Sequence, residues 1–304
     1  MGIFSGSDGL RMSLSPDVVH PRQNVTATIT TERPVDGVAT ATLEWGYDNF
    51  YRYHWAGRPD AAAAAGNDSI LTAGQVGTSH GGERDTDDWV CVTRVDLPVN
   101  SLANGEFTDA SATFKVPSWA PGSSPEIARW SARLRIERRG RDVDERGGFT
   151  VVIGTADVEA YEEPLEHVSG SGDTRIDVVL GSPVYRAGET IEGQIVLLPQ
   201  MELPPGDVAV YWQRQRESHP LVRYPAAGVA VDGRIVQLDK RIPLAEGVPV
   251  TLPFALPLPA DAAPTASAVH SSLSWFVAAR MFYSGFTGHQ VERVRRPITV
   301  VNAP

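Results

Sequence analysis

The chain has 304 residues, of which 42% are hydrophobic and 21% are charged. That length suits two β-sandwich domains of about 150 residues each, and the hydrophobic content excludes a largely disordered chain. The formal net charge of -10 argues against binding to nucleic acid or to an anionic membrane surface, because both favour clustered Lys and Arg.

The amino-terminal residues predict neither a signal peptide nor a lipid anchor. Residues 1–6 lack the basic start and long apolar run of a secretory signal, and Gly6 stands where the myristoylation pattern needs Ser or Thr. No apolar run approaches the ~20 residues of a membrane-spanning helix. We therefore expect a cytoplasmic protein with no integral membrane segment.

Two alternating apolar segments open the chain and predict a pair of β-strands. Apolar residues alternate with polar ones in residues 10–14, and the alternation resumes in residues 25–29 after a turn. The same order of strand, turn and strand returns 166 residues later, in residues 176–180 and 191–195. This similarity predicts that the chain contains two related β domains.

An aromatic segment follows in residues 45–55. If it forms one strand, these aromatic residues share a face: Trp45, Tyr47, Tyr51, Tyr53 and Trp55. Such a strand would be longer than is typical of a sandwich, so Asp48 and Asn49 are interpreted as a turn or bulge. Two interpretations stay open, namely that the aromatic residues fill the core of the first domain, or that they form an exposed strip for a partner.

Residues 56–88 are interpreted as a long insertion in the first domain. This stretch is rich in Ala, Gly, Thr and Asp and has no clear periodicity, which is typical of a functional or disordered loop. Its acidic residues and its histidine fit neither a zinc nor a calcium spacing. We expect a solvated acidic loop and no metal site; the residues considered are His80, Glu83, Asp85, Asp87 and Asp88.

Cys91 is the single cysteine, so no disulfide can form within the chain. It lies in the strand-like residues 89–93, where nothing nearby would activate a thiolate. We expect a buried structural cysteine and a reducing compartment.

The ends of the two halves also match. In both, a strand ends in proline, a loop of small residues and prolines follows, and a tryptophan begins the next strand; the matched residues are 114–117 with 254–257, 118–125 with 259–267, and Trp130 with Trp275. The order predicts an all-β chain with two tandem sandwich domains, residues 1–155 and 174–304, joined by a linker at residues 156–173.

No catalytic motif is present. The sequence has no Gly-x-Ser-x-Gly or His-Glu-x-x-His pattern, no phosphate loop and no dinucleotide fingerprint. We therefore predict a protein that is not an enzyme and uses no cofactor. Three basic residues near the end of the chain, Arg293, Arg295 and Arg296, are interpreted as a charged sheet edge that discourages pairing with other chains.

The second half resembles the arrestin-like family, in particular its small bacterial members related to sporulation-control proteins. The resemblance is carried by residues 185–195, which are similar to the family's tyrosine-x-x-Gly-Glu-x-Ile-x-Gly opening, and by residues 252–257 followed by 273–279. It implies two immunoglobulin-like β-sandwiches in tandem and an adaptor or scaffold that acts through protein contacts.

Two functions follow as expectations. The first is a non-enzymatic, arrestin-like adaptor that binds a protein partner, with regulation of sporulation or of an envelope or stress response as its setting, and with possible homo-oligomers through sheet edges. The alternative is a carbohydrate-binding sandwich that uses the aromatic strip of residues 45–55.

Overall fold

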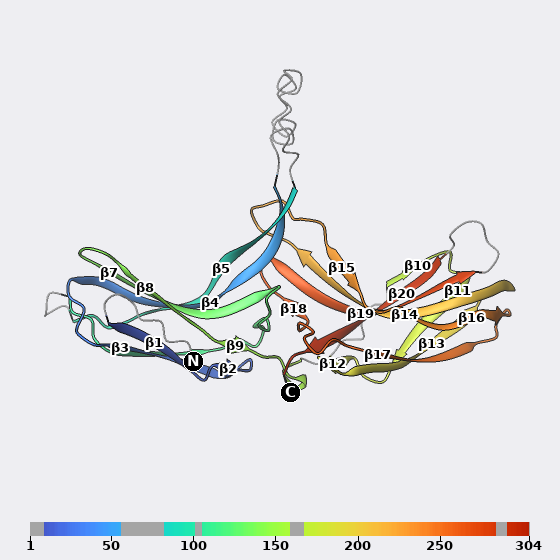
Figure 1. Ribbon diagram of the computed structural model, residues 1–304, viewed down its shortest axis with the longest axis horizontal. Helices are drawn as coiled ribbons and strands as arrows, with labels where there is room; N and C mark the ends of the chain where they lie inside the picture. The colour runs from blue at the N-terminus through green and yellow to red at the C-terminus, as the bar shows by residue number, and fades with distance from the viewer. Residues whose placement is uncertain (1–8, 56–81, 101–104, 159–166, 284–290, 304) are drawn as a thin grey trace, which may run out of the picture. The chain divides into compact units, whose positions relative to one another are not determined.

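The computed structural model describes residues 9–55, 82–100, 105–158, 167–283 and 291–303. The described part of the chain is nearly all β, with 66% of its residues in strands and 1% in a short 3-10 helix, Thr155–Asp157. Among the described residues, no helix is long and apolar enough to cross a membrane. The strands form several sheets (Figure 1).

The chain folds into two compact units. Unit 1 comprises residues 1–152 together with two short segments from later in the chain, residues 217–227 and 267–272. Unit 2 comprises residues 153–216, 228–266 and 273–304. The main division therefore falls between Val152 and Ile153, and unit 1 also includes two stretches that sequence order places in the second half.

Unit 1 contains a three-stranded sheet of order β1-β3-β6, a four-stranded sheet of order β5-β4-β7-β8, and a parallel pair, β2-β9. The strands are β1 (Leu10–Ser15), β2 (Val18–Val19), β3 (Asn24–Thr31), β4 (Val38–Trp55), β5 (Gly82–Asp96), β6 (Ala110–Lys115), β7 (Ala128–Arg138), β8 (Val143–Gly148) and β9 (Thr150–Val151). The two main sheets share one core, since Trp45 of β4 stacks on Phe114 of β6 with ring centroids 5.3 Å apart.

Unit 2 repeats this arrangement. A three-stranded sheet has the order β11-β13-β17, and a larger sheet has the order β10-β20-β19-β14-β15, with further pairing to β12, β16 and β18. The strands are β10 (His167–Ser169), β11 (Thr174–Leu180), β12 (Val184–Arg186), β13 (Thr190–Pro199), β14 (Leu203–Ser218), β15 (Val229–Asp232), β16 (Val236–Leu244), β17 (Val250–Pro257), β18 (Ala266–Ser267), β19 (Ser271–Tyr283) and β20 (Val291–Val301). Buried side chains from both sheets form one hydrophobic cluster.

Strand register is the same in the two units. Leu10 of β1 pairs with Thr31 of β3, and Ile176 of β11 pairs with Leu197 of β13, so a shift of 166 residues maps one pair onto the other. The parallel pairing of β2 with β9 recurs as that of β12 with β20. The repeat predicted from the sequence is therefore present in the pairing of the backbones.

A buried tryptophan holds the proline-rich loop in each unit. The Nε1–H of Trp130 donates to the carbonyl oxygen of Pro121 (2.8 Å), and that of Trp275 donates to the carbonyl oxygen of Ala263 (3.0 Å). Both indole rings are at most 1% exposed. Because a buried indole N–H needs a partner, this bond fixes the loop against the core in the same way twice.

The turns that precede β3 in unit 1 and β13 in unit 2 have the same backbone geometry but different residues. Arg22 has a φ of 70° and Gly188, its counterpart, has a φ of 82°. The next residue closes each turn: a side-chain oxygen of Gln23 or Glu189 accepts the backbone N–H of the residue three positions earlier, at 3.0 Å and 2.7 Å. The left-handed conformation is costly for any residue with a Cβ, so unit 1 carries strain that unit 2 avoids.

We therefore expect substitutions at these two matched positions to change the free energy of unfolding in opposite directions. Gly188→Ala should lower the free energy of unfolding by about 1 kcal/mol, because the new Cβ meets the left-handed φ. Arg22→Gly should raise it by about 0.5 kcal/mol, since part of the relieved strain is offset by the flexibility of glycine in the unfolded chain. Urea denaturation followed by circular dichroism measures both, and destabilisation by Arg22→Gly would contradict the strain argument.

Four expectations from the sequence need correction. The first concerns the match of Phe114 with Phe254. Val25 lies opposite Phe114, whereas Ile191, its counterpart, lies opposite Leu256. Phe114 therefore corresponds to Leu256. The predicted alignment was therefore shifted by two residues. Because side chains alternate between the two faces of a strand, a shift of two keeps every apolar residue on the same face, and the sequence pattern could not reveal it.

The second correction concerns Asp48 and Asn49, which do not form a turn. β4 runs without interruption through 18 residues, and the register shift against β5 lies earlier, between Trp45 and Gly46.

The third correction concerns residues 82–88, which are not a loop but the first part of β5, paired with residues 49–55 of β4. The remainder of the predicted insertion, including His80, lies outside the described residues.

The fourth correction concerns Cys91, which is exposed rather than buried. β5 lies at the edge of its sheet, and Cys91 pairs with Gly46, which has no side chain to cover it. Partial desolvation of the sulfur and the nearby carboxylate of Glu44 raise the pKa of the thiol, so the thiolate is disfavoured.

Candidate functional site

The aromatic residues of β4 divide into a buried set and a partly exposed set. Trp45, Tyr47 and Tyr51 are at most 1% exposed, because they face the core of unit 1. Tyr53 and Trp55, at the end of the strand, are of intermediate exposure. Three of the five predicted partner-binding residues therefore pack the domain, and two are placed where another molecule could reach them.

Arginine side chains lie over the two accessible rings. The guanidinium carbon of Arg84 is 4.4 Å from the ring centroid of Trp55, and that of Arg223 is 4.8 Å from the ring of Tyr53. Such contacts hold the rings in place and leave a surface that combines positive charge with apolar area.

The segment of residues 217–227 lies along β4 beyond the pairing of β4 with β7. His54 of β4 donates its backbone N–H to the carbonyl oxygen of Tyr224 (2.8 Å), and Ala226 donates to the carbonyl oxygen of Arg52 (3.3 Å). β4 and β5 run side by side there (Figure 1). The segment is thus fixed to a strand of the unit 1 sheet by backbone hydrogen bonds.

This segment presents the most exposed large apolar side chains of the described residues. Leu221 is 77% exposed, Val222 is 96% exposed and Tyr224 is 82% exposed. Single exposed apolar residues are common, but three within four positions, on a segment that pairs with β4 at Tyr53, form a candidate interaction surface. We name this set the 221–224 surface: Leu221, Val222, Tyr224, Tyr53 and Trp55.

Sequence reasoning missed Leu221, Val222 and Tyr224. A signal was available, since Pro220 and Pro225 bracket this short run and a central strand tolerates neither. Apolar residues that cannot lie in a central strand are less easily buried, so this run could have been predicted to be exposed. Its position beside Tyr53, in contrast, depends on tertiary contacts between residues about 170 positions apart.

Asn49 connects three parts of unit 1. It is fully buried, and its Nδ2 donates to the carbonyl oxygen of Ile127 (2.9 Å) and to the Oγ of Ser271 (2.8 Å). Its Oδ1 accepts the backbone N–H of His270 (2.6 Å). The amide thereby holds the segment of residues 267–272 onto β4.

Tyr51 lies next to this amide and closes the same region. Its hydroxyl donates to Oδ2 of Asp88 (2.6 Å), and its ring centroid is 5.1 Å from that of His270. Burial raises the pKa of Tyr51 to about 12, and Asp88 contributes in the same direction. The phenol therefore stays a neutral hydrogen-bond donor to a carboxylate.

A charged cluster lies on the outer face of the same sheet. Asp48 is 3% exposed and accepts hydrogen bonds from Arg133 (2.6 Å) and Arg146. The guanidinium carbon of Arg133 is also 3.7 Å from the ring centroid of Trp89. Burial lowers the pKa of Arg133, the neighbouring Arg146 lowers it further, and Asp48 opposes both. The carboxylate thus keeps two adjacent guanidinium groups together.

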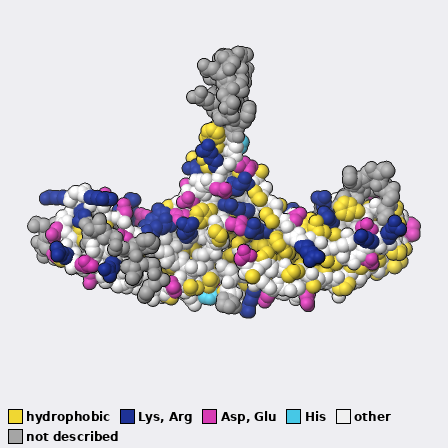
Figure 2. Space-filling view, viewed as in Figure 1, with side chains coloured by type: hydrophobic (Ala, Val, Ile, Leu, Met, Phe, Trp, Pro, Cys, Tyr) yellow, Lys and Arg dark blue, Asp and Glu magenta, His cyan; other side chains and the backbone are white. Residues whose placement is uncertain are grey.

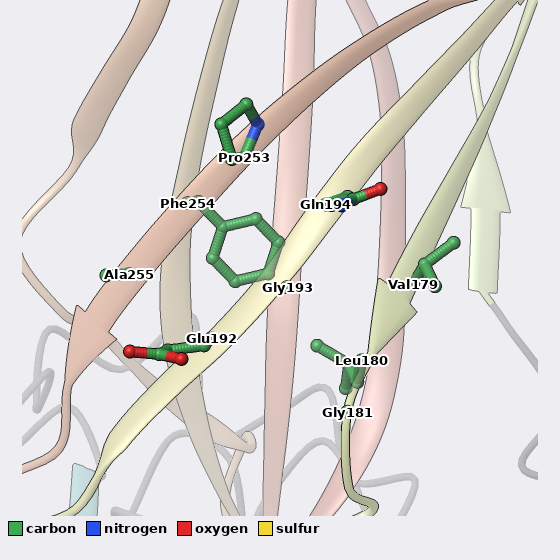
Figure 3. A pocket seen from close by; sticks show the side chains of 9 residues that line it. All are labelled: Val179, Leu180, Gly181, Glu192, Gly193, Gln194, Pro253, Phe254 and Ala255. Carbon is green, nitrogen blue, oxygen red and sulfur yellow. The ribbon is translucent and has the colours of Figure 1, made fainter.

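A shallow depression of about 720 Å³ lies on the three-stranded sheet of unit 2 (Figure 3). The ring of Phe254 lies beside Gly193, and a Cβ added at Gly193 would be 2.7 Å from the tip of that ring. The ring occupies the space that the missing side chain leaves. The depression is lined by Val179, Leu180, Gly181, Glu192, Gly193, Gln194, Pro253, Phe254 and Ala255.

In the described part of the chain, no group of three or more His, Cys, Asp or Glu residues is placed to hold a metal ion. Charged and hydrophobic side chains are interspersed on the face of the molecule that Figure 2 shows. The chain matches no family model, and a search of curated proteins finds no similar sequence.

Proposed function

We propose that this protein is a non-enzymatic, arrestin-like adaptor of the cytoplasm, built from two tandem immunoglobulin-like β-sandwiches, that binds a protein partner through the 221–224 surface. The repeated strand order and register support the tandem arrangement. Such a duplicated scaffold offers rigid strands on which exposed segments are held in place.

The observation that carries the proposal is the exposure of Leu221, Val222 and Tyr224 on a segment fixed to β4. Ordering such a segment before it meets a partner lowers the entropy lost on binding. Aromatic and arginine side chains gathered at one place are typical of the residues that dominate the binding energy of protein interfaces.

A protein partner fits this surface better than a carbohydrate does. Sugar rings stack on open aromatic faces, whereas Arg84 lies over the ring of Trp55 and Trp45 is buried in the core. The large exposed aliphatic side chains of Leu221 and Val222 would gain little from a hydroxyl-rich ligand but much from an apolar protein surface.

The variant Leu221→Ser/Val222→Ser/Tyr224→Ser tests the proposal. Affinity capture from a lysate of the native organism should recover a reproducible partner with the wild-type chain, and recovery by the variant should fall at least about tenfold, because apolar area at the centre of the contact is lost. Quantitative mass spectrometry compares the two, and analytical ultracentrifugation of the purified chain detects any self-association through sheet edges.

A matched control removes the same kind of side chain elsewhere. Trp119, Met201 and Val248 are 59%, 49% and 53% exposed, so their replacement by serine changes exposed apolar area away from the 221–224 surface. The control variant should recover the partner as the wild type does. Equal loss in both variants, or no reproducible partner at all, would count against the proposal.

A further inference from the structure

A basic hollow of about 400 Å³ lies on the larger sheet of unit 2. Four strands of that sheet, β10, β20, β19 and β14, contribute its walls, and its size is within the range of ligand-binding sites. Its lining residues are His167, Val168, Ser169, Tyr211, Gln213, Ala278, Ala279, Arg293, Val294 and Arg295.

Two arginine side chains line the hollow, and a third, Arg280, comes from the neighbouring strand. Arg293 and Arg295 come from β20, and Arg280 lies opposite Arg293 in the pairing of β19 with β20. All three act on the hydroxyl of Tyr211: burial raises its pKa, Asp232 raises it as well, and the arginines oppose them. The positive charge that acts on this phenol therefore comes from two neighbouring strands, β19 and β20.

None of these arginines forms an ion pair within the described residues. Arg295 donates Nη1 to the side-chain oxygens of Gln213 (3.1 Å) and Gln215 (3.0 Å), which are neutral. The guanidinium of Arg280 lies over the rings of Tyr211 and Phe282, and its Nε is buried without a hydrogen-bond partner.

The nearby carboxylates form hydrogen bonds with groups other than these arginines. Glu292, next to Arg293 in sequence, is buried and accepts hydrogen bonds from Ser171 and from the backbone of Gly172. Asp232 accepts a hydrogen bond from Gln213 (2.7 Å). In a chain of net charge -10, a hollow lined by two guanidinium groups that form no ion pair among the described residues is a local reversal of sign.

The placement of these residues corrects the earlier interpretation of a charged edge. β20 lies between β10 and β19 and is not an edge of the sheet. Arg293 and Arg295 are two residues apart on one strand, so they extend from the same face at a spacing of roughly 6.6 Å. Arg296 is directed elsewhere and donates Nη1 to the carbonyl oxygen of Val178 (2.6 Å).

We propose that this hollow binds an extended acidic segment of a protein partner, in which two carboxylates separated by one residue meet Arg293 and Arg295. An extended peptide places alternate side chains on one face at the same spacing of roughly 6.6 Å as the two arginines. The guanidinium fork matches a carboxylate through two parallel hydrogen bonds.

The inference deepens the proposed adaptor function and rests on it only for the partner being a protein. It is tested with synthetic peptides and the purified full-length chain, so it does not depend on capture of a native partner. Fluorescence anisotropy at low ionic strength compares a capped Ser-Glu-Gly-Glu-Ser peptide, its Gln-for-Glu version, and a Ser-Glu-Glu-Gly-Ser isomer whose adjacent carboxylates lie on opposite faces.

We expect the alternating Glu peptide to bind, to lose affinity as salt is added, and to bind about tenfold more tightly than either other peptide. Arg293→Gln/Arg295→Gln should weaken binding about tenfold or more. Arg293→Gln alone removes an exposed side chain and should weaken binding without affecting folding. Arg186→Gln on β12 changes the net charge of unit 2 equally and should bind as the wild type does.

Three results would overturn the inference. The first is equal binding of all three peptides. The second is equal weakening of binding by Arg186→Gln and Arg293→Gln. The third is displacement of the alternating peptide by inorganic phosphate together with no preference for the alternating spacing over the adjacent one. If the peptide does not bind but a partner is captured through the 221–224 surface, this inference fails and the proposed function stands. If the peptide binds but no partner is captured, this inference stands and the proposed function fails.

Discussion

Replacing Asp48 by alanine is expected to lower the free energy of unfolding by about 2 to 3 kcal/mol. The side chain of Asp48 is 5% exposed, and the substitution would leave the guanidinium groups of Arg133 and Arg146 adjacent with no shared carboxylate. Removing one member of a buried ion pair costs the desolvation of the other. The arginine side chains are 34% and 41% exposed, so water compensates part of that cost and the lower end of the range applies.

Urea denaturation measures the effect, and Asp144→Ala provides the control. Asp144 pairs with Arg135 on the same sheet face, but both side chains are more than 60% exposed, so its loss should cost less than about 0.5 kcal/mol. Asp48→Asn should fall between the two, because the amide oxygen still accepts one hydrogen bond. If Asp48→Ala and Asp144→Ala cost the same, the cluster does not stabilise the sheet.

Asp48 and Asn49 also show where reasoning from the sequence alone ends. Their residue types favour turns because their short polar side chains compete for backbone hydrogen bonds. In the structure these side chains bond instead to Arg133, Arg146, Ile127 and Ser271, all more than 70 positions away in sequence. Local propensity was overridden by tertiary partners that no local pattern reveals.

The register of the opening strands, in contrast, follows from the sequence. Residues 10–14 and 176–180 alternate in the same phase, and each must bury one face, so a shift of one residue would expose the apolar set. The observed pairs, Leu10 with Thr31 and Ile176 with Leu197, keep that phase. Alternation determines which face is buried, but it could not distinguish registers that differ by two residues, hence the error at Phe254.

The candidate site was predictable only in part. The aromatic residues of β4 were identified, yet composition could not tell which of them face the core. Tyr53 and Trp55 became distinct from Trp45 because the sheet extends beyond the core at the end of β4, where residues 217–227 replace β7 as the neighbour of β4. That replacement depends on contacts between distant parts of the chain.

Gly193→Ala is expected to destabilise the protein by about 2 kcal/mol, but by only about 1 kcal/mol in a chain from which Phe254→Ala has already removed the ring. A Cβ at Gly193 would lie 2.7 Å from the ring tip of Phe254 and 2.5 Å from the carbonyl oxygen of Val179. The ring can be removed by substitution, but the carbonyl oxygen belongs to the paired strand and stays, so recovery is incomplete.

The matched row in unit 1 supports this expectation. Ala27 and Ala112 pair there in the place of Gly193 and Phe254, so one unit uses two small side chains where the other uses glycine beside a large ring. The double variant therefore recreates in unit 2 a combination that unit 1 already accommodates. Phe254→Ala alone should cost about 3 kcal/mol, because it leaves a space beside Gly193.

A double-mutant cycle from four urea denaturation curves gives the coupling free energy. We expect the double variant to be more stable than the sum of the two single effects implies, by about 1 kcal/mol. Additive effects would mean that Gly193 is required by the backbone of β11 alone and that the ring of Phe254 is not in contact with it. In that case the two small side chains of unit 1 and the glycine and large ring of unit 2 would not be alternative ways to fill the same space. The two units would then share only the strand pairing at this position.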